Sequence, residues 1–524
     1  MPNRSTDELF QLVKSLEKSE KRNFRLYLKR LSGSEEMKSV QLFEYLDKVE
    51  GEDYDEEIML KKIPCIKKQQ LSNIKAHLYK QLLASLRMVL DDDNIEIYLD
   101  EQLVNANILY NKGLYLQSLR ILDRIKHIAK NNFQTTYWLQ IVIFEKKIEA
   151  LHITRSIDSR AEMLSKEIEE INARMTIQGR LSNLSLQLYG WYIKMGHARD
   201  EKDELAVKLF FETNMPKLNL NDLSFYEKMY YYQSHCWYYF ILQDFKLYFR
   251  NAQKWLDLFD DHPQMKAIET GQYIKSYHNL LSAHFETSNF ERFDQLLERF
   301  QEFAHSPVAN TNYNIRIQVF TYLNIARLNQ HFMQGTFSEG LLVVPEIEEG
   351  LKMYSLHLDR HRILVFYYKI ACLYFGSGDN DNCIHYLNKI IHIKYNLRTD
   401  LQCYARLLHL IAHYELGNYV ILDSLTKSVY RYMAKMKNLT IVEEEIFQFL
   451  RHTLKQKRGK KMTHTFVTLK NKLEKYEGNP LEARSFMYLD IIGWLESKIR
   501  NIPVQDVIKE KYKTKTASLN NFKP

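Results

Sequence analysis

The sequence predicts an all-α protein, an α-solenoid with helical caps at both ends, and three observations support this. Short turn signatures recur along most of the chain, and apolar residues flank them with a period of 3.6 residues. Gly and Pro number only 16 and 9 of 524 residues, whereas average usage is about 12% for the two together. A chain with so few helix breakers forms long helices joined by short loops.

The turn signature is a small or polar residue, a spacer and, usually, an aromatic residue. It occurs six times, and from the second copy onward the turns lie 39 to 47 residues apart. The copies are Gly113-Leu114-Tyr115, Gln243-Asp244-Phe245, Ser288-Asn289-Phe290, Gly335-Thr336-Phe337, Gly378-Asp379-Asn380 and Gly417-Asn418-Tyr419. The longer gap after the first copy leaves room for two further units, with turns near Ser156 and His197. One supersecondary unit repeated in this way is typical of helical hairpins stacked into a solenoid.

Apolar residues at fixed distances from each turn indicate two helices that face each other across it. Twelve residues after the first turn residue stand Ile125, Trp255, Phe300, Ile347, Ile390 and Val429. Seven residues before it stand Ala106, Cys236, Leu281, Leu328, Ala371 and Leu410.

This pattern resembles the tetratricopeptide repeat (TPR). In the two best copies, Ala106 with Ser118 and Ala371 with Cys383 are small residues where the helices of a TPR hairpin approach most closely. The units are longer than the standard 34 residues, so the pattern is TPR-like. The resemblance covers residues 95–440 and implies a solenoid of about eight hairpins.

The first 90 residues differ from the repeats. Apolar positions predict four helices, with faces at Leu9/Leu12/Val13/Leu16, Phe24/Tyr27/Leu28/Leu31, Leu42/Phe43/Leu46 and Leu71/Ile74/Leu78/Leu82/Leu86. We expect residues 1–90 to form a basic helical bundle that caps the solenoid, because end repeats need a covering element. The solenoid then spans 91–440, capping helices span 441–508, and 509–524 form a basic, flexible tail.

Both ends also resemble an uncharacterised family of bacterial cytoplasmic proteins. The segments concerned are Ser15-Leu-Glu-Lys-Ser-Glu-Lys-Arg22, Gln70-Leu-Ser-Asn-Ile-Lys-Ala-His-Leu-Tyr79 and Trp494-Leu-Glu-Ser-Lys498. The resemblance implies TPR-like repeats between such ends and no assigned activity.

No segment predicts a membrane span or a signal peptide, and we expect a cytoplasmic protein. The five cysteines form no CxxC pair, which is typical of reduced thiols. His357 and His361 have a spacing that suits zinc only if a third ligand joins them. Gly376-Ser-Gly378 lacks the Lys-Ser/Thr of a phosphate loop. We therefore predict no catalytic residues, no metal and no cofactor.

A binding groove is predicted on the concave face, which is lined by the first helix of each TPR-like hairpin. Counting back from the turns selects a mostly aromatic set: Tyr230, Trp237, Phe240, His278, Phe285, Tyr322, Asn329, Phe332, Tyr368, Phe375, Tyr404 and Tyr414. Such a groove would bind an extended or helical peptide. In the alternative interpretation these large side chains pack together and close the superhelix. Lys275, Arg316, Arg327, Arg362 and Arg406 share the same helices and either bind an acidic ligand or face solvent.

A second hypothesis concerns the basic N-terminal region. From Ile58 to Leu90 it has seven basic residues and no acid. Lys61, Lys62, Lys67, Lys68, Lys75 and Lys80 would contact nucleic acid through its phosphates, or would form a solvated face. The sequence therefore predicts a non-enzymatic scaffold that binds a partner protein or peptide; the alternative is a nucleic-acid-associated regulator with the solenoid as sensor.

Overall fold

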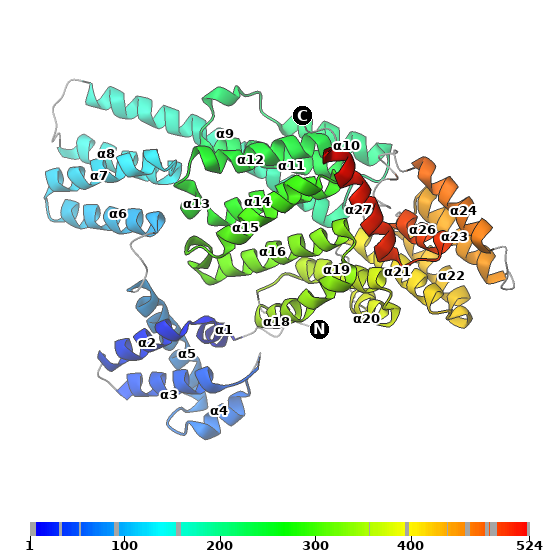
Figure 1. Ribbon diagram of the computed structural model, residues 1–524. Coiled ribbons are helices and arrows are strands. Elements are labelled where there is room, and N and C mark those ends of the chain that lie inside the picture. The colour runs from blue at the N-terminus through cyan, green and yellow to red at the C-terminus, as the bar shows by residue number, and fades with distance from the viewer. Residues whose placement is uncertain are drawn as a thin grey trace. The chain divides into compact units, whose positions relative to one another are not determined.

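The computed structural model describes residues 7–30, 34–51, 54–88, 94–152, 159–355, 357–392, 398–436, 439–455, 462–476, 482 and 490–520. These residues form helices and connecting turns, with no strand among them (Figure 1). The chain divides into two compact units, Met1–Ile125 and Lys126–Pro524. The boundary predicted at residue 90 falls in 89–93, outside the described residues.

The N-terminal unit begins with a bundle of helices around one apolar core. Its helices are α1 (Glu8–Ser15), α2 (Lys18–Arg30), α3 (Ser34–Lys48), α4 (Glu56–Lys62) and α5 (Lys68–Arg87). The core contains the predicted faces, including Leu9, Phe24, Phe43 and Leu78, all buried. Leu31 lies outside the described residues.

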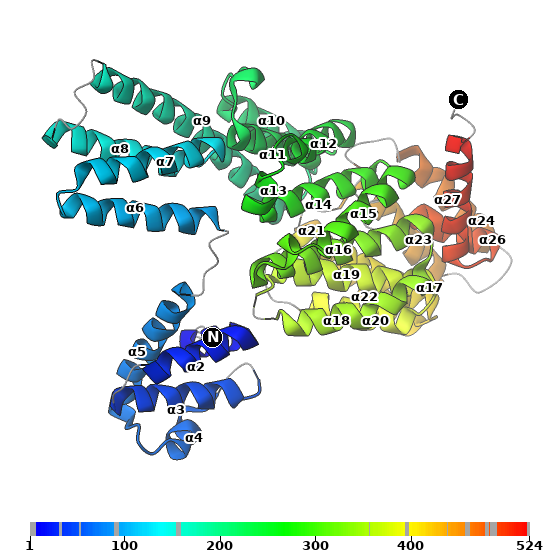
Figure 2. The same cartoon turned by 60° about the vertical axis from the view of Figure 1, so that its left-hand side comes forward.

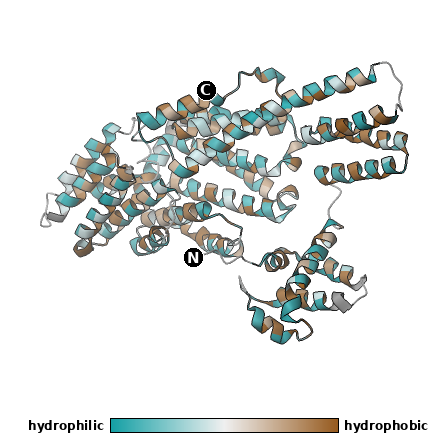
Figure 3. Cartoon of the chain, turned by 180° about the vertical axis from the view of Figure 1, so that it is seen from behind, coloured by the Kyte–Doolittle hydropathy of each residue, from teal (hydrophilic) through white to brown (hydrophobic). Residues whose placement is uncertain are grey.

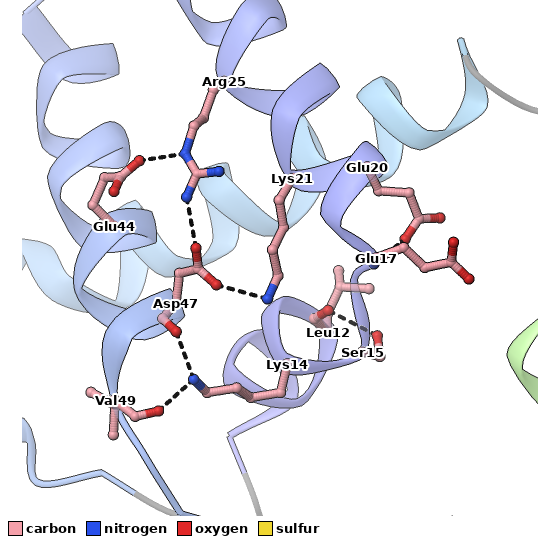
Figure 4. Close-up of polar contacts among 10 residues, drawn as sticks. All are labelled: Leu12, Lys14, Ser15, Glu17, Glu20, Lys21, Arg25, Glu44, Asp47 and Val49. Atoms are coloured by element: carbon pink, nitrogen blue, oxygen red, sulfur yellow. Dashed lines mark hydrogen bonds and ion pairs between the residues drawn. The ribbon is translucent and has the colours of Figure 1, made fainter.

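Basic side chains of α1 and α2 hold these helices on α3 (Figure 4). Lys21 and Arg25 form ion pairs with Asp47 at 2.7 and 2.6 Å, and Arg25 also pairs with Glu44. Lys14 donates a hydrogen bond to the carbonyl of Asp47 at 2.9 Å. Lys14 therefore satisfies one of the carbonyl groups that the end of a helix leaves without a partner.

In the remaining part of this unit, the small residues Ala106 and Ser118 lie in contact between two helices. After α6 (Ile95–Asn111), helix α7 (Tyr115–Asn131) starts in this unit and crosses the division. Ser118 and Ala106 are both fully buried, and the Ser118 hydroxyl donates to the carbonyl of Ala106 at 2.8 Å. Two small residues let the backbones of α6 and α7 approach closely enough for this bond.

The second unit is a succession of helices, which Figures 1 and 2 show from two sides. After the end of α7 they are α8 (Thr135–His152), α9 (Arg160–Met195), α10 (Glu201–Asn214), α11 (Phe225–Ile241), α12 (Phe245–Asp261), α13 (Met265–Ile268), α14 (Thr270–Glu286), α15 (Phe290–Ala304), α16 (Tyr313–Gln334), α17 (Phe337–Gly340), α18 (Val344–Met353), α19 (Arg360–Ser377), α20 (Asn380–Ile391), α21 (Thr399–Glu415), α22 (Tyr419–Lys435), α23 (Ile441–Lys455), α24 (Met462–Leu473), α26 (Ile491–Arg500) and α27 (Val504–Asn520). Hydrophobic and hydrophilic residues alternate along these ribbons (Figure 3). Helices α12, α15 and α20 each bury an apolar face, the pattern expected of helices that pack on one side.

All six predicted turns lie between two helices, and the first residue of each has a positive φ. The values are +77° for Gly113, +61° for Gln243, +52° for Ser288, +69° for Gly335, +92° for Gly378 and +71° for Gly417. A left-handed residue directly after a helix ends it and reverses the chain. Glycine adopts this conformation without strain, which explains four of the six choices.

The two further units, for which turns were expected near Ser156 and His197, differ from the prediction. The turn expected near Ser156 falls in 153–158, outside the described residues. The turn expected near His197 exists, at Gly196. However, one helix, α9, of 36 residues fills the segment between these two turns. No Gly or Pro with helix-breaking geometry interrupts it, since Gly179 and Gly190 both remain helical.

The expectation of a flexible tail from Lys509 is also wrong for residues 509–520, which belong to α27. Helix α27 contacts α16, α19 and α26. Val507 and Ile508 are buried, and the α27 backbone passes so close to Gly335 that a Cβ there would lie 2.6 Å from the Lys509 nitrogen. The many Lys and Thr residues concealed an apolar stripe at Val504, Ile508 and Tyr512.

Candidate functional site

The helices of the second unit surround a central cavity. Contacts run from α9 to α11 and α12, then through α14, α16, α19 and α21, and α21 returns to contact α9. Where α21 contacts α9, Arg398 and Asp400 form a buried ion pair at 2.8 Å beside Gly196. The helices therefore close around the cavity, and the large side chains do not fill it completely.

The cavity has a volume of about 1110 Å³ and lies along much of two helices. Its lining extends from Gly271 to Glu286 on α14 and from His361 to Gly376 on α19. Fifteen residues of helix extend about 22 Å, so the cavity is elongated. Pockets for drug-sized ligands measure about 300–1,000 Å³, which places this cavity above that range.

Nine of the twelve residues predicted for the groove line this cavity. They come from α11, α14, α16 and α19: Trp237, Phe240, His278, Phe285, Tyr322, Asn329, Phe332, Tyr368 and Phe375. His278 stacks on Tyr322 with ring centroids 4.4 Å apart. The helical offsets thus selected residues that the fold brings together.

The other three residues lie elsewhere. Tyr230 is half-buried against the apolar core formed with α12 and α14. Tyr404 and Tyr414 are buried in the core of the C-terminal half. The rings of Phe449 and Trp494 lie 6.1 and 6.2 Å from that of Tyr414, because the helices after α22 cover this part of α21.

Two lysines enter the cavity from opposite helices. Lys275 on α14 lies over the rings of Tyr189 and Trp237, at 5.5 and 5.8 Å from their centroids. Within the described part of the chain it has no hydrogen-bond or ion-pair partner. Lys369 on α19 lies over Phe285 and Phe332 and donates to the amide oxygen of Asn329 at 2.5 Å. Aromatic faces stabilise both ammonium groups.

Arg362, also on α19, is a third cation that lines the cavity, besides Lys275 and Lys369. Its guanidinium donates to the Tyr322 hydroxyl at 3.1 Å and pairs with Asp359 at 2.6 Å. The remaining predicted cations are engaged outside the lining. Arg327 pairs with Glu346, Arg406 donates to the carbonyls of Gln402 and Ile391, and Arg316 lies over Tyr313.

The protein surroundings shift the pKa values of these groups strongly. Burial, aided by the charge of Arg362, lowers the pKa of Lys275 to about 8. Burial also lowers the pKa of Lys369 to about 8. Burial raises the pKa of Glu286 to about 7 although Lys369 opposes the shift. Low polarisability around a buried group disfavours its charged form, so an oppositely charged ligand would restore the ordinary protonation.

Two histidines of the cavity are neutral at pH 7. Burial and the charge of Arg362 lower the pKa of His278 to about 3. Burial and Arg398 lower that of His361 to about 4. The Nδ1 atom of His361 is buried and has no hydrogen-bond partner among the described residues. A bound molecule or water could satisfy it, since buried polar atoms usually have a partner.

Sequence reasoning missed two groups of lining residues. Tyr189 and Tyr192 come from the long helix α9, which precedes a turn that lacks the aromatic signature. Ile508, Lys511, Tyr512 and Lys515 come from α27. The ring of Tyr512 lies 4.9 Å from that of Phe290, edge to face. The apolar spacing within Val504–Tyr512 was the signal for this helix, because it repeats every three to four residues.

The predicted nucleic-acid residues lie on α4, α5 and the loop between them. Lys61, Lys62, Lys67, Lys68 and Lys80 are exposed. Lys75 is instead an internal partner of Asp7 and Glu56, at 2.6 and 2.5 Å. Although burial opposes it, hydrogen bonding to Asp7 and Glu56 raises the pKa of Lys75. Lys75 thus fixes α5 to the start of α1.

Comparisons with protein families, with curated proteins and with solved structures found no match to this chain. None of the described helices is long and apolar enough to cross a membrane. The described residues include no group of three or more His, Cys, Asp or Glu side chains that could hold a metal ion.

Proposed function

We propose that this chain is a TPR-like α-solenoid that works as a non-enzymatic interaction module and binds an extended segment of a partner protein in the central cavity. The observation that carries this proposal is the elongated cavity of about 1110 Å³ with its aromatic lining. An extended segment advances about 3.3 Å per residue, so six or seven residues match a length of about 22 Å. Aromatic side chains often anchor such interfaces.

The chemistry of the lining favours binding over catalysis. Burial raises the pKa of the Cys372 thiol to about 12, which favours the poorly nucleophilic protonated form. Lys369 donates to the amide oxygen of Asn329, and this contact positions its ammonium group to bind an anionic group of a ligand.

Selection from a random twelve-residue peptide library on the full chain tests this proposal. We expect peptides whose affinity falls at least tenfold in Phe285→Ala and Phe332→Ala, because an aromatic anchor contributes more than about 1.4 kcal/mol. Tyr230→Ala is the control, since Tyr230 lies outside the lining. Peptides that bind all these variants equally, or no peptides at all, would contradict the proposal. Circular dichroism verifies that each variant is folded.

A second candidate function rests on the exposed lysines Lys61, Lys62, Lys67 and Lys68. We propose that they contact the phosphates of nucleic acid if the chain is a regulator. Fluorescence anisotropy with single- and double-stranded oligonucleotides at increasing salt tests this. Charge reversal of the four lysines should abolish binding and flatten the salt dependence, whereas Lys246→Glu on the exposed side of α12 should not. Salt-independent binding, or none, contradicts this candidate.

A further inference from the structure

Charge is distributed unevenly over the cavity wall. Six cationic side chains line it, and only three carboxylates do. The cations are Lys275, Arg362, Lys369, Arg398, Lys511 and Lys515; the carboxylates are Glu269, Glu286 and Asp490. Three of these cations already pair with carboxylates outside the lining, since Arg362 pairs with Asp359, Arg398 with Asp400 and Lys511 with Glu496. Lys275 and Lys369 form no ion pair among the described residues, so an anionic ligand would be complementary to them.

Helices α14 and α19 carry two centres of positive charge that line the cavity. At the first centre, Lys275 lies over Trp237 and Tyr189, and Arg362 bonds to the Tyr322 hydroxyl. At the second centre, Lys369 lies between Phe285 and Phe332. Unpaired buried charge is costly, and Lys275 has no anionic partner among the described residues. A carboxylate at the first centre would supply the partner that Lys275 lacks, and a carboxylate at the second centre would join the amide oxygen of Asn329 as an acceptor for Lys369.

The helix fixes the distance between the two centres. Arg362 and Lys369 are seven residues apart on α19, so they share one face and lie about 10 Å apart along its axis. A peptide in the polyproline II conformation has three residues per turn and rises about 3.1 Å per residue, so its side chains i and i+3 point to the same side about 9 Å apart. Between the centres the wall contributes Ile325 and Val365, which suit apolar side chains.

We propose that the cavity selects an acidic peptide segment in which two Asp or Glu residues, three positions apart, enclose apolar or aromatic residues. The first carboxylate pairs with Lys275 and Arg362, and the second with Lys369. This inference rests on the proposed function, since it names the class of segment that the cavity binds.

The test uses the peptides selected on the full chain. We expect enrichment of Asp or Glu pairs at positions i and i+3 with apolar residues between them. In calorimetric titrations of one such peptide, changing either acid to its amide should weaken binding about tenfold or more, as expected for a charge-assisted hydrogen bond.

Lysine variants assign each carboxylate to its centre. In Lys369→Met, the amide change at one acid should no longer matter, while the change at the other acid keeps its effect. Lys275→Met should reduce the effect of the amide change at the other acid without abolishing it, because Arg362 still pairs with that acid, and the exposed Lys246→Met should behave as the parent chain. Met retains the packing of the side chain, and replacing an unpaired buried charge with an apolar group favours folding.

The outcomes separate the two proposals. Cavity-dependent peptides that are neutral or basic, or acids without the spacing of three, would overturn this inference and leave the proposed function standing. Acid pairs whose effect does not change in either lysine variant would also overturn it. If no peptide depends on the cavity, both proposals fail.

Discussion

Gly196 at the end of α9 lies directly against Asp400 in the first turn of α21, and a Cβ on Gly196 would be 2.9 Å from Oδ2 of Asp400. The carboxylate of Asp400 cannot easily move, because Nε and Nη2 of Arg398 donate to its two oxygens at 2.9 and 2.8 Å. This close approach joins α21 to α9, so that the succession of helices around the cavity returns to its start.

We predict that Gly196→Ala destabilises the second unit more than Gly378→Ala. Both glycines have a positive φ, which costs alanine about 1 kcal/mol, but a Cβ on Gly378 meets nothing within 4 Å. The clash with Asp400 should bring the loss for Gly196→Ala to about 2–3 kcal/mol. All five Trp residues lie in this unit, so denaturant unfolding followed by Trp fluorescence reports it. Equal losses would refute the role of this contact.

The buried pair of Arg398 and Asp400 should be far more sensitive than an exposed pair. Both residues are at most 4% exposed, so Arg398→Met leaves Asp400 as a buried charge without its bidentate partner, at a cost of about 3–5 kcal/mol. Arg327→Met removes the exposed pair with Glu346 and should cost less than about 1 kcal/mol. The same fluorescence assay measures both, and a loss for Arg398→Met no greater than the control would argue against the pair's role.

Gly335→Ala should displace α27 from the cavity. The added methyl group would meet the α27 backbone at 2.6 and 2.8 Å, at the Lys509 nitrogen and the Gln505 carbonyl oxygen. We expect faster amide hydrogen exchange throughout Val504–Asn520, with the protection of α14 retained. Gly378→Ala introduces comparable backbone strain and leaves α27 untouched. Unchanged exchange of α27 in Gly335→Ala would mean that this close approach does not hold the helix.

Lys275 and Lys369 should make stability depend on pH in the alkaline range. Burial lowers the pKa of both to about 8 in the folded chain, against about 10.4 when unfolded. Between these values the unfolded state binds more protons, so the free energy of unfolding rises with pH from about 8 to 10.4. The double variant Lys275→Met/Lys369→Met should lack this rise, which we expect to be about 1–3 kcal/mol.

Glu286 should make the free energy of unfolding depend on pH in a different, more acidic range. Its pKa is raised to about 7, so between pH values of about 4.3 and 7 the folded state keeps a proton that the unfolded state loses, and stability falls as pH rises.

For the prediction on the two lysines, Lys246→Met serves as control, because Lys246 is exposed. If the parent chain and the double lysine variant have the same stability profile above pH 8, the two lysines are not held in a desolvated environment.

Local physical chemistry explains what could be predicted. The helix faces around Phe24, Phe43 and Leu78 follow from apolar spacing alone. Gly335 and Gly378 end helices because only glycine takes a left-handed conformation without strain, and this depends on no distant residue. For the same reason, counting from these turns placed Phe285, Tyr322 and Phe332 on one face.

The sequence by itself therefore determined the all-helical class, the six turns and the aromatic character of one helix face. The tertiary structure decided which aromatic residues reach the cavity. Tyr404 and Tyr414 have the same offsets as lining residues, but both are buried in the core, and Tyr414 packs against Phe449 and Trp494 of the C-terminal helices. The tertiary structure also placed α27 beside Gly335 and joined Gly196 to Asp400. These contacts depend on surfaces far apart in the sequence, and periodicity within a helix says which face is apolar but not what covers it.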